Sequence, residues 1–109
     1  MGKYLIVLES NCKDPAREKE FNEWYDQIHI PDIFETPCYV KASRYELTQP
    51  AEGKGKYITV YEIESDDIDA DMEKHMANMK NKSAQGRMSD LIAVVSRGVY
   101  KEIASHSRA

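Results

Sequence analysis

The sequence lacks the features that identify several large classes of protein. It has only two cysteines, Cys12 and Cys38, and no Cys-x-x-Cys spacing, which argues against a disulfide framework and a structural zinc site. No segment approaches the roughly 18 consecutive apolar residues of a membrane span. The glycines form neither a phosphate-binding loop nor a dinucleotide fingerprint, and no serine stands in a nucleophile elbow. We therefore expect free thiols, no metal and no cofactor.

Charge of one sign never accumulates along the chain. The 15 basic and 19 acidic side chains give a formal charge of -4 without a basic run, which argues against nucleic acid as a partner. The first residues lead directly into a strand-like run and not into a signal peptide, so we expect a cytoplasmic protein without a membrane partner. A chain of 109 residues with 41% apolar content predicts one globular domain, residues 1–109.

What the sequence does contain is a regular succession of strand and helix signals. Residues 3–9 are apolar on both alternating faces, which predicts a strand in the middle of a sheet. Asp14-Pro15 predicts the start of a first helix, and the Ser65–Asp67 segment the start of a second. Strands are predicted at residues 38–47, 57–63 and 91–103, and residues 81–90 are predicted to form a loop. The order βαββαβ predicts an α+β, ferredoxin-like fold with both helices on one face of an antiparallel sheet.

The other face of this sheet needs a cover. Its alternating apolar side chains would otherwise form a large exposed patch. A second copy of the chain, related by a two-fold axis, is the cover that we expect, and this predicts a homodimer.

The central stretch of the chain is residues 21–32. Phe21, Trp24, Tyr25 and Ile28 have the spacing of one buried helical stripe, and Pro31 is expected to end the helix at His29 or Ile30. His29 would then lie in the last turn. There the free carbonyls, together with Asp26 and Asp32, would favour the charged imidazole and raise its pKa.

These residues resemble a known family. The run Phe21–Asp26, followed by His29–Asp32, Pro37 and Ala42–Tyr45, is similar to the EthD-like members of the dimeric α+β barrel superfamily. The resemblance implies two ferredoxin-like protomers whose sheets enclose a barrel, with a small-molecule pocket between sheet and helices or at the dimer centre. Relatives include cofactor-independent monooxygenases, muconolactone-type isomerases, polyketide cyclases and dehydratases. One departure is Cys38, where related sequences usually have Pro-Gly, a more permissive backbone.

His29 is the main catalytic candidate, because its intrinsic pKa places proton exchange near neutrality. The alternative is a histidine that only caps the helix end or closes a loop through Asp32. Tyr25 offers a hydroxyl to an oxyanion or a proton relay, or else it is a core residue. Asp32 either orients His29 or caps the short turn after Pro31.

Arg44 interrupts the apolar pattern of its strand. It either places a fixed cation in the cavity, to hold a carboxylate or enolate, or pairs with Glu46 or Glu62 at an exposed edge. Trp24 is core or pocket wall in either case. His75 lies beside an apolar stripe of the second helix, which consists of Ile68, Met72, Met76 and Met79. It is either a partly solvated side chain at the edge of this stripe or an acid or base that faces the pocket. The expected pocket-lining residues are Trp24, Tyr57, Thr59, Tyr61 and His75; in the alternative, the three from the 57–63 strand pack a dimer interface.

Together these residues favour an enzyme that works by acid–base proton transfer without a cofactor. The leading prediction is a lyase, isomerase or cyclase that acts on a small aromatic, lactone or polyketide-like carbonyl compound. The first alternative is a cofactor-independent monooxygenase. The second is a dimer that binds a small molecule without catalysis.

Overall fold

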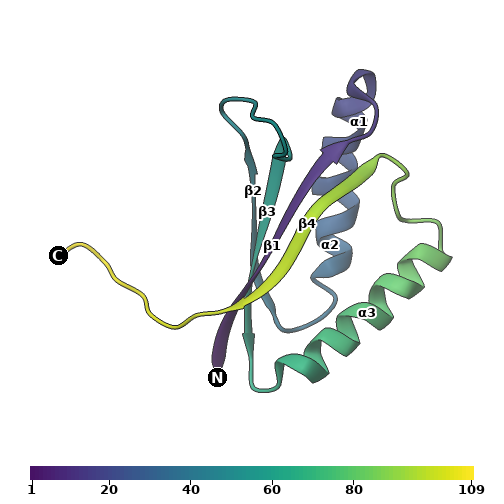
Figure 1. Ribbon diagram of the computed structural model, residues 1–109. Helices are drawn as coiled ribbons and strands as arrows, with labels where there is room; N and C mark the ends of the chain where they lie inside the picture. Colours follow the sequence, from purple (N-terminus) through teal and green to yellow (C-terminus); the bar gives the residue numbers. More distant parts are fainter.

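The computed structural model describes residues 1–109, and its elements follow the predicted order (Figure 1). They are β1 (Gly2–Cys12), α1 (Glu18–Trp24), a π-helical turn (Tyr25–His29), α2 (Ile30–Ile33), β2 (Tyr39–Glu46), β3 (Tyr57–Ser65), α3 (Ile68–Ala84) and β4 (Ile92–Lys101). The strands form one antiparallel sheet in the order β2-β3-β1-β4, with the helices on one face (Figure 1). This arrangement confirms the ferredoxin-like α+β fold. None of the helices combines the length and the apolar character that crossing a bilayer requires.

β1 and β3 are the central strands, and their register decides which side chains face the helices. β1 pairs with β3 on one side and with β4 on the other, so both of its backbone edges are hydrogen-bonded. Ile6 and Ser10 are buried on the helix side, and Leu5 and Val7 alternate onto the opposite face. The two-sided apolar run of residues 3–9 therefore identified the centre of the sheet correctly.

Both helix starts also form as predicted. The carboxylate of Asp14 accepts the backbone N–H of Ala16 at 3.0 Å, and a short 3₁₀ turn, Pro15–Arg17, leads into α1. The carboxylate of Asp67 accepts the N–H of Ala70 at 3.1 Å at the start of α3. Each side chain satisfies an amide that has no partner within its own helix.

The first helix does not end before Pro31, so that prediction was wrong. At Tyr25–His29 the helix widens into a π turn, in which the N–H of Ile30 reaches the carbonyl of Tyr25, and α2 continues through Pro31. In a regular α-helix the proline ring clashes with the carbonyl four residues earlier, and the wider turn relieves that clash. Ile30 keeps helical backbone angles, and His29 lies inside a continuous helical segment.

α3 is longer and more exposed than predicted. It continues to Ala84, into the stretch predicted to be a loop, and Met76 of the expected apolar stripe is 67% exposed. No residue of α3 is buried. The helix touches the core through Ile68, Met72 and Met79.

The core is divided into two clusters. One lies under α2 and α3 and is centred on Ile6, Tyr61 and Ile63. The other lies under α1 and the π turn and is mostly aromatic, because Phe21, Trp24, Tyr25 and Tyr57 form it with Leu91. The π turn spans the boundary between them.

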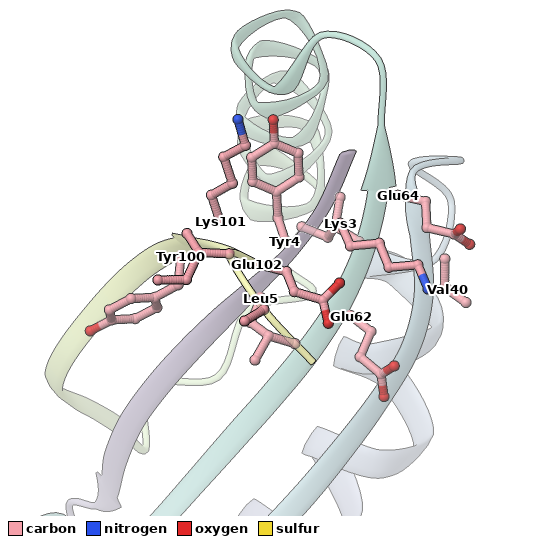
Figure 2. Close-up of a pocket in the computed structure, with 12 residues that line it drawn as sticks. Lys3, Tyr4, Leu5, Val40, Glu62, Glu64, Tyr100, Lys101 and Glu102 are labelled. Carbon is pink, nitrogen blue, oxygen red and sulfur yellow. The ribbon is translucent and has the colours of Figure 1, made fainter. Parts of the chain in front are cut away.

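The opposite face of the sheet is open in the single chain. Near the end of β4, Tyr4 and Lys101 point toward the helix side, and Leu5, Tyr100 and Glu62 point away from it (Figure 2). A cavity of about 560 Å³ lies here, and a second, of about 450 Å³, lies beside the loop between β2 and β3. This is the face for which the sequence predicts a second copy.

Candidate active site

The π turn holds His29 against two aromatic rings. The imidazole is 7% exposed and stacks on Trp24, with ring centroids 4.5 Å apart. It meets Tyr25 edge-on at 5.2 Å. The indole N–H of Trp24 donates to the carbonyl of Arg87 at 2.8 Å, which fixes the plane on which His29 stacks. The histidine is therefore held rigidly in an apolar setting.

Burial lowers the pKa of His29 to about 4, the opposite of the predicted direction. Removal of water disfavours the charged imidazole, and the negative charge of Asp32 opposes this effect only in part. Because the helix continues past His29, the free carbonyls of a helix end are not there to hold a positive charge. The ring nitrogens make no hydrogen bond and are not sealed from solvent, so the neutral imidazole can accept a proton.

Asp32 fulfils neither of its predicted roles. Its two carboxylate oxygens accept bonds from Arg87, at 2.7 and 3.0 Å, and its backbone carbonyl accepts the amide of Asn78 at 2.8 Å. The ion pair with Arg87 lowers the pKa of Asp32. The residue joins α2 to α3 and to the segment after α3, and it makes no hydrogen bond to His29.

Arg44 pairs with neither Glu46 nor Glu62. It lies on the helix-side face of β2, and its guanidinium donates to Asn22 at 2.8 Å and to Asp26 at 3.1 Å. The guanidinium carbon sits 4.3 Å from the centre of the Tyr25 ring, a cation–π contact. Its Nε is buried without a partner. A fixed cation with one unused donor thus lies beside Tyr25.

The three expected residues of β3 face the helices and are buried, so they do not pack the open face of the sheet. The hydroxyl of Tyr61 donates to that of Tyr25 at 3.4 Å, and burial raises the pKa of Tyr61. Thr59 Oγ1 is buried without a partner. Tyr57 turns toward the start of α1, where its hydroxyl donates to Glu18 at 3.3 Å, away from His29.

His75 of α3 is half-buried and bonded to a residue that the sequence did not single out. Its Nδ1 lies 2.9 Å from the hydroxyl of Tyr39. Burial, together with the charge of Arg97, lowers the pKa of His75 to about 4, and burial raises the pKa of Tyr39. Both groups are therefore neutral near pH 7.

The sequence did not predict Tyr39 as a site residue, because the strand β2 is irregular near it. Simple alternation from Arg44 and Ala42 would place Tyr39 on the opposite face of the sheet. The pairing of β2 with β3 shifts between Tyr39 and Lys41, and one extra residue turns Tyr39 to the helix side. No residue pattern in this stretch signals the shift.

The structure thus brings His29, Tyr25 and Arg44 together, with Tyr61 linking them to the ring of Tyr39 at 5.6 Å between centroids. His75 joins this group through Tyr39, whereas Tyr57 and Asp32 are occupied elsewhere. Neither of the two cavities on the open face borders His29. No three histidine, cysteine or acidic side chains converge in a way that could hold a metal ion.

Comparison with known proteins agrees with this architecture. The family model described as a domain of unknown function, DUF4286, matches residues 6–97. No curated protein matches the chain.

Solved structures share the fold at low sequence identity. SnoaB, a cofactor-independent oxygenase from Streptomyces nogalater, has a TM-score of 0.69 and 10% identity, over 96% of this chain and 97% of its own. A dimeric ferredoxin-like protein from an uncultured marine organism has a TM-score of 0.67 and 9% identity, over 97% and 100%. An EthD-like protein from Ralstonia eutropha has a TM-score of 0.61 and 15% identity, over 98% and 97%. The resemblance to EthD-like proteins is confirmed for the fold.

Proposed function

The chain belongs to the DUF4286 family, whose description names no activity, and we propose that it is a cofactor-free enzyme that removes a proton from a phenol or an enolisable carbonyl compound. The observation that carries this proposal is the neutral, rigidly held imidazole of His29, whose nitrogens have no hydrogen-bond partner. In its apolar setting a protonated imidazole is costly by itself. An anion formed beside it by the loss of the substrate's proton lowers that cost, because the two opposite charges attract.

The neighbouring groups suit the stabilisation of such an anion. Tyr61 donates its hydroxyl hydrogen to Tyr25, which leaves the hydroxyl hydrogen of the buried Tyr25 without an acceptor in the chain, and we propose that a substrate oxygen accepts it. Arg44 adds a fixed positive charge beside Tyr25 and a donor, Nε, that the protein leaves unused. Donors that are already oriented stabilise a developing oxyanion without reorganisation.

We propose reaction with oxygen as the fate of the anion. The electron-rich carbanion gives a hydroperoxide with O₂, and loss of water from it leaves a quinone. One oxygen atom enters the product and the other leaves as water with the two hydrogens that the substrate loses, so no external reductant is required. Support comes from the shared fold of SnoaB, described as a cofactor-independent oxygenase, and from the aromatic walls around His29.

The second candidate is an isomerase or lyase, the reaction class that the sequence favours. One observation supports it: a second neutral imidazole, His75, faces the same side of the sheet from α3. One histidine would remove the proton at one carbon while the other returns a proton at a different carbon, so that no oxygen is consumed.

The experiment combines two measurements on the purified protein. Wild type and His29→Phe, which keeps a ring stacked on Trp24, are incubated with 1-naphthol in deuterated buffer. Oxygen uptake is recorded with an electrode, and ring deuteration by mass spectrometry. Oxygen uptake lost in the variant supports the oxygenase, and deuteration without oxygen uptake supports the isomerase or lyase. Equal behaviour of wild type and variant overturns the role of His29 and favours a non-catalytic binding protein.

We also propose that two copies pair through the open face of the sheet. That face carries apolar side chains and two exposed aromatic rings: Leu5, Val7, Ile58, Val60, Tyr45 and Tyr100. Exposure of this apolar area to water is unfavourable in free energy. Support comes from the solved neighbour described as dimeric.

A further inference from the structure

Arg97 lies in a row of side chains that crosses all four strands on the helix-side face. It pairs with Leu8 of β1, and Leu8 pairs with Thr59 of β3. Thr59 pairs in turn with Arg44 of β2. Cross-strand partners point to the same face of a sheet, so Arg97 faces the helices at the β4 edge as Arg44 does at the β2 side.

The surface around Arg97 is apolar and uncovered. Val99 pairs with Ile6 and Val94 pairs with Ser10, so both valines also face the helix side. They remain 42% and 55% exposed, because α3 buries none of its own residues against this half of the sheet. Leu8, Val94 and Val99 therefore form an open apolar strip, here called the β4 strip, with Arg97 in its middle.

The charge of Arg97 is not neutralised within the chain. The guanidinium groups of Arg17, Arg44 and Arg87 each pair with a carboxylate, whereas Arg97 makes no ion pair and no hydrogen bond. The buried acid of the chain, Asp32 on α2, is held by Arg87. An arginine in an apolar strip without an acidic partner is a ready site for an external anion.

A second donor points to the same kind of ligand. The raised pKa of Tyr39 keeps its hydroxyl protonated, and this hydroxyl shares a hydrogen bond with Nδ1 of His75 at 2.9 Å. In the tautomer of neutral His75 that accepts the hydroxyl hydrogen of Tyr39, Nε2 carries the proton and is a donor. The positive charge of Arg97 adds to the lowering of the pKa of His75 by burial, and it opposes part of the rise in the pKa of Tyr39. Thr59, in the row with Arg97, also has a buried hydroxyl without a partner.

We propose that Arg97 binds the anionic group of the substrate, a carboxylate or an ionised phenol, while the β4 strip holds its aromatic body. The site would then accept aromatic acids and reject their neutral analogues. This inference names the substrate class of the proposed enzyme and rests on that function for its biological role, although the binding itself can be measured without turnover.

The test is a calorimetric titration of the full-length protein with 2-naphthoate and with its neutral analogue 2-naphthamide. The wild-type protein is expected to bind naphthoate at least about tenfold more tightly than naphthamide. Hydrogen bonds to charged groups are stronger than those between neutral groups. Arg97→Gln should reduce naphthoate binding to the level of naphthamide, and Arg97→Lys should keep part of the difference. Arg108→Gln, which removes one positive charge from the exposed tail, is the matched control and should change nothing.

Two results overturn the inference: equal affinity of wild type for the acid and the amide, or equal losses in Arg97→Gln and Arg108→Gln. His29→Phe separates this inference from the proposed function. That variant should still bind naphthoate while it loses proton removal from 1-naphthol. If naphthoate binding depends on Arg97 but proton removal does not depend on His29, the anion site stands and the proposed enzyme mechanism fails.

Discussion

The backbone N–H of Ile30 bonds to the carbonyl oxygen of Tyr25, five residues earlier. This bond closes the π turn and admits Pro31 into the helix. The same turn sets the position of His29 against Trp24 and Tyr25. Pro31, two residues after His29, is thus coupled to the geometry of the candidate base.

Pro31→Ala should tighten the π turn into a regular α-helix. The variant gains a backbone donor and no longer needs the wider turn that avoids the ring clash, so its free energy of unfolding should rise, by up to about 3 kcal/mol. His29 would rotate away from Trp24, and proton removal should fall about a hundredfold, because small displacements of reacting groups are costly. Urea unfolding and deuterium incorporation measure the two effects. Full activity together with higher stability would show that the π turn does not position His29.

The stability of the protein should depend on pH through His29. The pKa of His29 is about 4 in the folded chain and about 6.5 in an unfolded one, so the unfolded state binds more protons between these values. The free energy of unfolding should therefore rise as the pH increases from 4 to 6.5, by about 3 kcal/mol from this group. His29→Phe should remove that share of the rise, measured by urea unfolding at several pH values. An NMR titration of His29 with a midpoint near 6.5 would contradict the prediction.

Asp32→Asn should weaken the connection between α2 and the segment after α3. The variant loses the bidentate ion pair with Arg87. Because Arg87 is partly exposed, water replaces part of the lost interaction, and we expect about 1–2 kcal/mol of destabilisation at pH 7. The pKa of Asp32 is lowered in the folded state, so its contribution is present at pH 7 and disappears as the pH falls through that lowered pKa. Wild type and variant should be equally stable in strong acid. A difference that persists there would mean that charge is not the cause.

Arg44→Lys tests whether a planar cation is needed beside Tyr25. Lysine keeps the positive charge but cannot make the two bonds to Asn22 and Asp26 and also stack on the ring. We expect a loss of about 1–2 kcal/mol in stability and a fall of at least about tenfold in proton removal. Lys41→Arg, on the opposite face of the same strand, is the reciprocal control and should leave both quantities unchanged.

Val60→Lys should prevent two copies from pairing through the open face. The substitution places a charge in the middle of the apolar area, where pairing would bury it without a partner. The molecular mass in solution, measured by light scattering, should fall from that of a dimer to that of a monomer. Met76→Lys, on the exposed side of α3, makes the same change elsewhere and should leave the mass unaltered.

Much of the fold was predictable because its signals are local. The two-sided apolar run placed β1 in the centre, and Asp14 and Asp67 marked both helix starts. The helix ends were not predictable to the same degree. A proline such as Pro31 normally stops a helix. Here the neighbouring π turn lets the helix continue, and no sequence pattern predicts that turn.

The sequence predicted the residues of the candidate site better than it predicted their contacts. Tyr25, His29 and Arg44 do come together, but the sign of the pKa shift of His29 depends on how deeply the ring is buried, which no local pattern states. Asp32 was assigned to His29 because the two are close in the chain, whereas its partner Arg87 is distant in sequence and adjacent in space. Tyr39 was missed because a register shift in β2 sets the face on which it lies.

Because α3 has no buried side chain, we expect it to unfold locally before the rest of the molecule. A helix that buries no side chain, and that is held by partly buried apolar contacts and by polar pairs such as Lys82 with Glu35, detaches at a lower free energy than the central strands do. Its backbone amides should therefore exchange with solvent well before those of β1 and β3. Each such excursion would uncover Tyr39 and Tyr61 and open a temporary entrance for small molecules to the interior.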